Sequence, residues 1–330
     1  MLEVNKIYQG DCLELMKEID DGSIDVIITD PPYGTVKGLG GDIEKYKHLS
    51  NSNWDVTLNS KDMFRECERV LRENGRLILF SQEPYTSRLI IEAHNNLPFN
   101  YRLVWIKDHF ANCLVVNKAP VSYFEDIIVF TKKYDTLNLN PLRKYAKKVM
   151  DYIGLNIKQI NKKLGHRKAE HFFYINTMQF GICTEETYSE LVKVFDLIEM
   201  EGLLKFKDLK IMNQKSEAVF NLQEGKKVKS NVLNHKKDYG GLHPTQKPVS
   251  LIGDLIKTYS NEGNVVLDFT MGSGTTVIAC LNTNRKFMGM ELDEGYFEVA
   301  FKRIVEHKNN LEKNKIQTKL NEVKPNSSHD

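Results

Sequence analysis

The stretch IDVIITDPPYGT, residues 24–35, decides the fold class of this chain. Its first half, IDVIIT, is short, apolar and β-branched, which is typical of a buried strand. Pro31 and Pro32 then end the strand, because a proline has no N–H to donate to a neighbouring strand. We therefore expect Asp30 and Tyr33 on a stiff turn at the carboxyl end of a strand. In open α/β sheets that edge binds ligands. The alternative is an ordinary turn with a solvated aspartate.

Strands and helices alternate on both sides of this stretch. Before residue 134, the apolar runs at 76–80, 101–107 and 123–133 predict strands, and 63–74 has helical spacing, with Gly75 placed to end the helix. After residue 241, the pattern predicts helices and strands in turn, at 248–260, 264–269, 275–284, 285–293 and 296–308. Such alternation predicts an α/β fold with a mostly parallel sheet covered by helices.

The middle of the chain has a different character. Residues 131–240 contain 21 Lys and Arg against 13 Asp and Glu, a net +8, whereas the rest of the chain has a net −6. A basic helical pattern at 157–165, the turn at Gly165 and a second basic stretch at 166–177 resemble a helix-turn-helix. A third helix is expected at 184–198, and 223–241 reads as a basic loop. A basic block in an otherwise acidic chain predicts nucleic-acid binding. The alternative is a solvated lysine-rich face.

These patterns divide the chain into four parts. Residues 1–134 and 241–309 are expected to form one α/β domain, 135–240 a helical basic insert, and 310–330 a flexible tail rich in Lys, Asn and Ser.

Composition excludes several classes of protein. No apolar segment approaches the length of a membrane span, and the N-terminal residues lack the features of a signal peptide. The five cysteines are scattered, without a C-x-x-C pair, which argues against a disulfide framework and against a zinc site. We expect a cytoplasmic protein without a membrane partner or a bound metal.

A second motif, VLDFTMGSGTT at 266–276, predicts a strand, a glycine turn and a helix N-terminus. Gly272 and Gly274 allow a tight turn and a close approach of the backbone to a ligand. Glu291 ends the next strand, 23 residues after Asp268, where dinucleotide folds place an acidic acceptor for ribose hydroxyls. Val277 occupies the position of the third glycine of G-x-G-x-x-G, and the lysine of a phosphate-binding loop is missing.

The charge around this turn narrows the range of cofactors that could bind there. Asp268, Asp293 and Glu294 make the surroundings acidic, which suits a cationic or zwitterionic cofactor better than a pyrophosphate. S-adenosylmethionine carries both a sulfonium and an ammonium. The alternative is a tight turn that binds no ligand.

The two motifs together predict a methyl transfer to an aromatic amine. The exocyclic amine of adenine or cytosine is a poor nucleophile, because its lone pair is delocalised into the ring. Hydrogen bonds from its two N–H groups to Asp30 and to the carbonyl of Pro31 would localise that lone pair beside the methyl group. Tyr33 would offer an aromatic face to a flipped-out base.

D-P-P-Y together with D-F-x-x-G-S-G-T-T resembles the S-adenosylmethionine-dependent DNA amino-methyltransferases. The order, with the catalytic motif first and a basic insert between the motifs, is similar to the β group of that family. Supporting matches are GDC at 10–12, W-x-K at 105–107, NKAP with Phe124 and Glu125 further on, HPTQKPVSLI at 243–252 and RKFMGMELDEGYFEVAFKRI at 285–304. The resemblance covers about 1–134 and 240–305.

The resemblance implies a Rossmann-like fold with seven strands, mostly parallel, and one antiparallel hairpin. It implies a catalytic pocket made by Asp30, Pro31, Pro32 and Tyr33. It implies cofactor contacts from the following residues: Asp268, Phe269, Gly272, Ser273, Gly274 and Thr275 on the methionine side, Lys247 at the methionine end, Glu291 at the ribose, and Asp11 and Cys12 by the adenine, on the strand that precedes D-P-P-Y. For Asp11 alone a helix cap is the simpler interpretation, and for Lys247 a surface position.

In the family the insert is the target-recognition region. We therefore expect DNA contacts from Lys158, Lys162, Lys163, Arg167 and Lys168. The loop at 34–55 is interpreted as a lid over cofactor and base, although Trp54 could equally anchor the core.

The predicted function is site-specific methylation of adenine N6 in double-stranded DNA, with S-adenosylmethionine as methyl donor. In the family an aspartate at the first motif position goes more often with adenine, and N4-cytosine is the alternative. A non-catalytic DNA-binding subunit, a nicotinamide oxidoreductase and an RNA substrate are further alternatives. A homodimer and a paired restriction endonuclease are candidate partners, and the target sequence is not readable from the chain.

Overall fold

The computed structural model describes residues 1–34, 56–111, 116–135, 140–177, 179–238 and 246–323. The lid expected at 34–55, including Trp54, lies outside the described residues except for Gly34.

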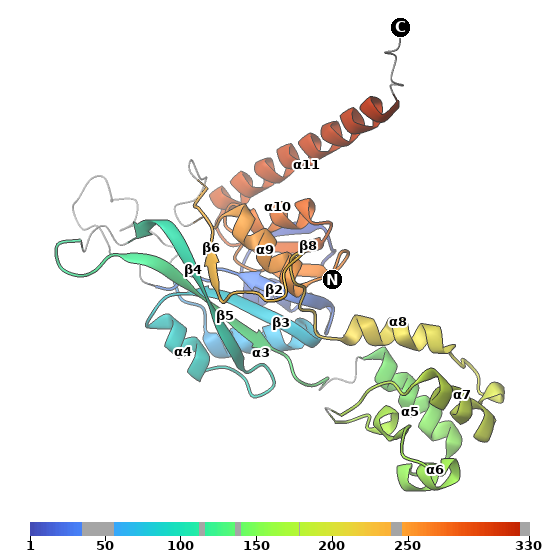
Figure 1. Cartoon of the computed structure of the whole chain (residues 1–330). Helices are drawn as coiled ribbons and strands as arrows, with labels where there is room; N and C mark the ends of the chain where they lie inside the picture. Colours follow the sequence, from blue (N-terminus) through green and yellow to red (C-terminus); the bar gives the residue numbers. More distant parts are fainter. Residues whose placement is uncertain (35–55, 112–115, 136–139, 178, 239–245, 324–330) are drawn as a thin grey trace.

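An eight-stranded sheet, in the order β1-β8-β7-β2-β3-β5-β4-β6, forms the body of the protein (Figure 1). The strands are β1 (Lys6–Gln9), β2 (Ile24–Thr29), β3 (Leu71–Ser81), β4 (Phe99–Ala111), β5 (Ser122–Thr131), β6 (Val232–Asn234), β7 (Val265–Asp268) and β8 (Lys286–Glu291). All neighbours pair in parallel except β3 with β5 and β5 with β4. The mostly parallel α/β sheet with one antiparallel hairpin is confirmed.

The expected number of seven strands is wrong. β6 pairs with β4 at the edge of the sheet, within the segment 223–241 that was expected to be a loop. The sequence hides this strand, because VLN is only three residues long and its flanks are rich in lysine.

Helices cover both faces of the sheet and also form the insert. They are α1 (Cys12–Met16), α3 (Ser60–Val70), α4 (Tyr85–Ile91), α5 (Pro141–Ile153), α6 (Ile157–Leu164), α7 (Glu185–Val194), α8 (Phe206–Ser216), α9 (Val249–Tyr259), α10 (Thr275–Asn282) and α11 (Glu294–Val323), with short 3₁₀ turns η3 (Glu170–Phe173) and η4 (Leu197–Glu199). Helices α9, α10 and the start of α11 pack on one face, and α1, α3 and α4 on the other, so each face has its own apolar core.

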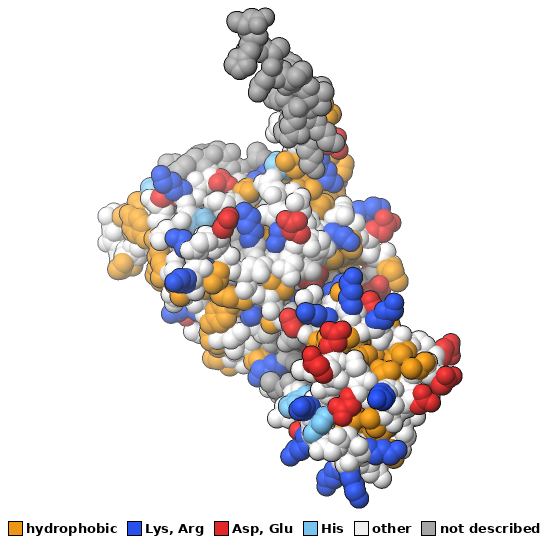
Figure 2. All heavy atoms as spheres, turned by 45° about the vertical axis from the view of Figure 1, so that its right-hand side comes forward, with side chains coloured by type: hydrophobic (Ala, Val, Ile, Leu, Met, Phe, Trp, Pro, Cys, Tyr) orange, Lys and Arg blue, Asp and Glu red, His pale blue; other side chains and the backbone are white. Residues whose placement is uncertain are grey.

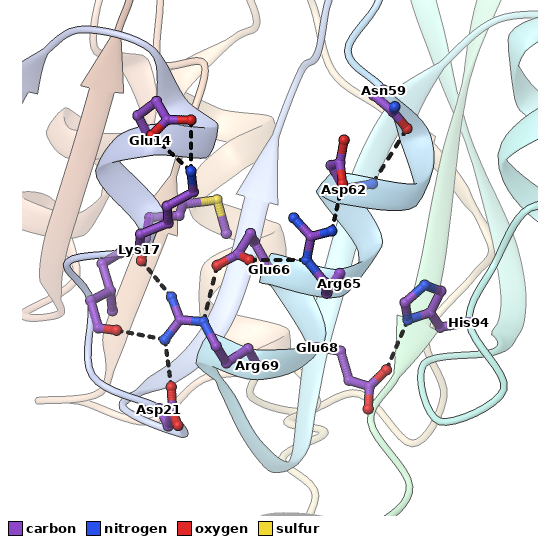
Figure 3. A network of polar contacts seen from close by, with 12 residues as sticks. Glu14, Lys17, Asp21, Asn59, Asp62, Arg65, Glu66, Glu68, Arg69 and His94 are labelled. Atoms are coloured by element: carbon purple, nitrogen blue, oxygen red, sulfur yellow. Dashed lines mark hydrogen bonds and ion pairs between the residues drawn. The ribbon is translucent and has the colours of Figure 1, made fainter.

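Helix α3 ends earlier than its pattern predicts. The helix stops at Val70, and Gly75 lies inside β3 instead of ending the helix. The end of α3 is fixed by Arg69, whose guanidinium donates to the carbonyls of Met16 and Ile19 and pairs with Glu66 (Figure 3). These bonds tie α3 to the segment after α1, and the chain enters the sheet directly after the helix.

The insert has a core of its own. Helices α5–α8 enclose a third apolar cluster that includes Tyr145, Phe172 and Leu191. The cluster joins the sheet at the amino end of β3, where Arg143 pairs with the buried Glu73 at 2.6 Å. The chain leaves the cluster after Ser216, and Asn221 already hydrogen-bonds to the carbonyl of Thr258 in the α/β domain. The described residues 217–238 of the expected insert thus lie against the α/β domain.

The last helix projects from the body (Figure 1). α11 continues to Val323, well past residue 310, where a flexible tail was expected. Among the described residues, none of the helices has the length and apolar character needed to cross a membrane.

The close packing at Gly75 predicts a stability effect. A Cβ on Gly75 would lie 2.9 Å from the carbonyl oxygen of Arg72 and 3.0 Å from that of Asp25. We expect Gly75→Ala to lower the free energy of unfolding by about 1–3 kcal/mol, measured by urea denaturation. The matched control is Gly253→Ala in α9, where a Cβ meets nothing within 4 Å, and which should be neutral or stabilising. Equal effects of the two changes would contradict the packing argument.

Candidate active site

The two sequence motifs meet at the carboxyl edge of the sheet. β2 and β7 are parallel neighbours, with Val26 opposite Val266, so the turns that follow them lie side by side. Thr29 at the end of β2 donates to Asp268 at the end of β7 over 2.7 Å. The structure thus brings D-P-P-Y and the glycine turn together, at the edge where parallel sheets bind ligands.

Asp30 stands at the centre of this edge, and each of its oxygens accepts a hydrogen bond. The Tyr33 hydroxyl lies 2.6 Å from Oδ1, and the Lys247 ammonium donates to Oδ2. Asp30 is half-buried, and Pro31 after it is buried. The ring of Tyr33 packs against that of Tyr85, with centroids 5.7 Å apart, and the buried Tyr85 hydroxyl has no hydrogen-bond partner among the described residues.

A buried ion network surrounds Asp30. Lys247 also donates to Glu125 over 2.9 Å, and Glu125 accepts from Lys107 over 2.7 Å on its other oxygen. The Tyr33 hydroxyl is 2.9 Å from Glu125. Two carboxylates therefore face two ammonium groups, and the side chains of Lys247, Glu125 and Lys107 are less than a tenth exposed. Burial of such ions is tolerable only because they are paired.

Asp30, Glu125 and Lys247 have shifted pKa values in this network. Burial raises the pKa of Asp30 above its ordinary value, more than the charge of Lys247 lowers it. Burial also disfavours the charged form of Glu125, but Lys247 and Lys107 outweigh it and lower the pKa of that carboxyl to about 2. For Lys247 burial is likewise outweighed, by Asp30 and Glu125, so its pKa is raised. Asp30 is thus the carboxylate that takes up a proton more readily.

The ammonium of Lys247 lies at the D-P-P-Y turn, where it pairs with Asp30 and is 5.0 Å from the centre of the Phe80 ring. The contact with the methionine end of the cofactor, which the resemblance implies for Lys247, stays a prediction. Its neighbour Gln246 accepts from the Ser273 hydroxyl over 3.0 Å. The pair Gln246 and Lys247 therefore bridges the glycine turn and the catalytic turn.

The glycine turn has the geometry that its sequence predicts. Gly272 and Gly274 have φ of +52° and +78°, a region that glycine adopts readily. Gly274 begins α10 without a side-chain cap, so the first N–H groups of the helix have no side-chain acceptor there. Glu291 accepts from the backbone N–H of Gly272 over 2.8 Å and from that of Asp293 over 2.9 Å. Since each carboxylate oxygen has two acceptor sites, both retain one.

The remaining residues of the motif are buried in and around the turn. Phe269 belongs to the core between the sheet and α3, and Ser273 and Thr275 both accept from Arg303 of α11. Burial raises the pKa of Asp268 to about 6, against the hydrogen bonds that it accepts.

Asp11 and Cys12 were expected on a strand, but neither residue lies on one. β1 ends at Gln9, and Asp11 caps α1, accepting from the backbone N–H of Leu13 and of Glu14. They nevertheless lie beside Glu291, because Gln9 is its partner in the pairing of β1 with β8. The capping interpretation of Asp11 is therefore the one that the structure supports directly.

The five basic residues expected to contact DNA do not join this site. Lys158, Lys162 and Lys163 are exposed on α6, with Arg167 and Lys168 exposed just after it. The insert meets the sheet at Glu73, near the start of β3. Asp30 directly follows β2, at the opposite, carboxyl edge of the sheet. Figure 2 shows acidic and basic side chains interleaved on the visible face of the insert, which is the lobe at the bottom of that view.

Sequence reasoning missed part of the network. Lys107 and Glu125 were noted only as family matches, and Tyr85 was not noted at all. No local signal marks them, since they come from β4, β5 and α4 and reach Asp30 only through the sheet. Among the described residues, no group of three or more His, Cys, Asp or Glu could hold a metal ion.

A family model supplies the identification. The DNA methylase model named N6_N4_Mtase matches residues 24–302, from the start of β2 into α11. The chain belongs to this DNA methylase family. The match spans the D-P-P-Y turn, the helical insert and the glycine turn.

Curated relatives agree over nearly the whole chain. The type II methyltransferase M.HpaI of Haemophilus parainfluenzae is 26% identical and covers 91% of this chain and 74% of its own. M.HindIII of Haemophilus influenzae is 25% identical over 94% of this chain and 99% of its own. The DNA adenine methyltransferase YhdJ of Escherichia coli K12 is 24% identical over 92% and 83%.

Solved structures support the fold. The M1.HpyAVI–SAM complex aligns with a TM-score of 0.52 at 19% identity, over 91% of this chain and 98% of that one. TTHA0409 of Thermus thermophilus aligns with a TM-score of 0.50 at 17% identity, over 92% and 96%.

The buried network predicts a cost for removing its central cation. Lys247→Met would leave Asp30 and Glu125 to share a single ammonium, that of Lys107, on the far side of Glu125. We expect a loss of about 3–5 kcal/mol in the free energy of unfolding at pH 7, measured by urea denaturation. Lys147→Met is the control, since Lys147 and Asp151 form an exposed pair with side chains 61% and 63% exposed, and it should change stability by under about 0.5 kcal/mol. Similar losses in both variants would contradict the proposed contribution of the network to the free energy of unfolding.

Proposed function

We propose that this protein is a site-specific DNA methyltransferase that methylates the N6 amine of an adenine flipped out of double-stranded DNA. The observation that carries the proposal is the meeting of the D-P-P-Y turn and the glycine turn at one sheet edge, linked through Thr29 and Asp268. An amine acceptor and a cofactor cradle are thereby adjacent, as a direct transfer between two bound molecules requires.

Lys247 supports the role of Asp30 as an acceptor for the target amine. Its ammonium is an N–H donor that already occupies Oδ2 of Asp30. In the proposed complex an N–H of the adenine amine takes this place, and Lys247 keeps its bond to Glu125. The carbonyl of Pro31 accepts the second N–H, and the ring of Tyr33 stacks on the base. Both hydrogen bonds increase electron density on the amine nitrogen.

S-adenosylmethionine is the proposed methyl donor, and it supplies a methyl group bound to a positively charged sulfur. The glycine turn fits such a molecule in two ways. The N-terminus of α10 lacks a side-chain cap at Gly274 and can receive a carboxylate. Asp268 and Glu291 provide negative charge for an ammonium and acceptors for hydroxyls, and Glu291 retains acceptor sites.

Asp30 is also the proposed first acceptor of the proton that the amine loses after methylation. Its pKa is raised by burial, whereas that of Glu125 is held at about 2 by two lysines. The proton therefore goes to Asp30 and not to Glu125, and solvent can take it up afterwards through the exposed part of the Asp30 side chain.

Adenine, rather than cytosine, is proposed from the aspartate of the D-P-P-Y motif and from the similarity to YhdJ, which is named a DNA adenine methyltransferase. The similarity to type II methyltransferases favours a restriction-modification role with a paired endonuclease. A homodimer remains part of the proposal.

The decisive experiment is transfer of labelled methyl groups from S-adenosylmethionine to unmethylated genomic DNA, followed by nucleoside mass analysis and mapping of the methylated sites. N6-methyladenine at a defined sequence is the expected product. N4-methylcytosine would keep the mechanism and overturn the choice of base. Absence of label in DNA, with the cofactor bound, would contradict the proposal.

Asp30→Ala tests the catalytic assignment. We expect it to reduce the rate of transfer by about 100-fold or more, because it removes an acceptor facing the charge that develops on the amine. Cofactor affinity, measured by calorimetry, should remain within about threefold. Asp62→Ala on α3 is the control and should retain full activity, since the Asp62 side chain pairs with Arg65 on the surface of that helix. An Asp30→Ala variant with unchanged activity would refute the proposed role of Asp30 as an acceptor for the target amine.

The pKa of Asp268 predicts how cofactor binding depends on pH. The carboxyl has a pKa of about 6 in the free protein, and its ionised form favours a cationic ligand. Affinity for S-adenosylmethionine should therefore rise by up to about tenfold between pH 5 and pH 7. Asp268→Asn should flatten this rise, as measured by calorimetry across that range. A pH-independent affinity in the unaltered protein would show that Asp268 is not beside the bound cation.

A further inference from the structure

The β4–β5 hairpin extends beyond the rest of the sheet. β3 pairs with β5 only as far as Ser81 opposite Asp126, and β6 pairs with β4 only as far as Ile106. Within the described part of the chain, the strand residues beyond these points, 107–111 of β4 and 122–125 of β5, have no further strand beside them. We call these two segments the ribbon; they project from the edge of the sheet in Figure 1.

The ribbon carries exposed aromatic rings on both faces. Tyr123 and Phe124 are each 49% exposed. Because side chains alternate along a strand, Tyr123 shares the face of Glu125 and Phe124 lies on the other face. The ring of Phe110 lies 5.9 Å from that of Tyr123 and 4.6 Å from that of His109. A small aromatic group thus gathers around Tyr123.

The base of the ribbon is a wall of the catalytic pocket. Lys107 and Glu125 are its innermost residues, and both belong to the ion network around Asp30. Tyr123 is two residues from Glu125 on the same face, so the aromatic group begins about 7 Å along the strand from the pocket. A group of a larger molecule can enter the pocket only if the rest of that molecule lies close to this face of the ribbon.

A lysine lies beside the same wall. The backbone N–H of Lys237 donates to Asp108 of the ribbon over 3.0 Å. The Lys237 side chain is only half-buried, and its pKa is lowered by burial and then by repulsion from Lys107. An ammonium that is already crowded by cations gains from an external anion, and a phosphate would supply one.

We propose that the pocket-facing side of the ribbon, with Tyr123 supported by Phe110 and with Lys237 beside it, is the surface that receives double-stranded DNA next to the target base. A two-stranded ribbon has the width that the major groove admits. Tyr123 stacks on or beside the base pair that the flipped base leaves, and Lys237 contacts a neighbouring phosphate. This inference rests on the proposed function.

The alternative DNA surface is the helical insert. It is attached at Glu73, and β3 pairs regularly with β5 from Arg76 to Ser81, five residue steps that correspond to about 17 Å at about 3.3 Å per residue. Its five predicted contact residues lie further away still, on and after α6, and Arg167 is paired with Glu170 at 2.8 Å. The insert therefore cannot touch the base pairs beside a base held at Asp30, whereas the ribbon can.

The test compares substitutions on the two faces of the ribbon. Binding of the full-length protein to sheared unmethylated genomic DNA is measured by fluorescence anisotropy at several salt concentrations, with bound S-adenosylhomocysteine. Methyl transfer to the same fragments is measured at limiting DNA. We expect Tyr123→Ala to lower the transfer rate at limiting DNA by about tenfold or more, whereas Tyr123→Phe, which keeps the ring, stays within about threefold. Lys237→Ala should weaken binding and lower its salt slope by about one.

Phe124→Ala is the matched control, because Phe124 is equally exposed on the opposite face. An equal loss with Phe124→Ala would overturn the proposal, as would a Tyr123→Phe variant as impaired as Tyr123→Ala. A fourfold substitution of Lys162, Lys163, Arg167 and Lys168 that impairs transfer more than Tyr123→Ala would assign recognition to the insert. Thermal unfolding of each variant identifies losses caused by misfolding.

The outcome separates this inference from the proposed function. Transfer by the unaltered protein with no effect of Tyr123→Ala or Lys237→Ala overturns the ribbon alone. If the unaltered protein binds the fragments without methylating them, the proposed function fails, and the effect of Lys237→Ala on the salt slope still decides whether the ribbon contacts DNA.

Discussion

The ammonium of Lys247, held between Asp30 and Glu125, is the interaction on which the architecture of the site depends. It joins three segments that are far apart in the sequence: the turn after β2, the strand β5 and the segment before α9. Each of these groups would be expensive to bury alone, and together with Lys107 they balance two negative and two positive charges. The network can therefore form only when the sheet has assembled, since the sheet is what brings β5 beside the end of β2 through β3.

The same interaction links the two halves of the proposed chemistry. Gln246 binds Ser273 of the glycine turn, and its neighbour Lys247 binds Asp30. A ligand that rearranges the glycine turn thereby acts on the segment that holds the acceptor of the target amine. In this structure the acceptor is already satisfied by an internal donor, so a base must compete with Lys247 for Asp30. Release of the ammonium toward Glu125, to which it is already bonded, keeps it paired throughout.

The parts of the fold that the sequence predicted are those written in local pattern. IDVIIT is a central strand because Val26 and Ile28 pack into one core and Ile27 into the other. The glycine turn forms because Gly272 and Gly274 permit positive φ. The errors arise from contacts between distant segments. Gly75 does not end α3, because the carbonyls of Arg72 and Asp25 crowd it within β3. β6 exists only because the edge of β4 is open to it. The pairing of Lys247 with Asp30 was not predicted, because only the folded sheet brings the ammonium to that carboxylate.

The position of the insert follows from the direction of β5. That strand runs antiparallel to β3, so the chain leaves it at the amino edge of the parallel strands, away from Asp30. A duplex advances about 3.4 Å per base pair, and the distance of about 17 Å along the regular part of β3 therefore corresponds to about five base pairs. A straight duplex that contacts both surfaces must run along the sheet, with the insert at least that far from the flipped base. Recognition of the base pairs nearest the target then falls to the elements at the carboxyl edge, and among the described residues the ribbon is the one that combines exposed rings with a wall of the pocket.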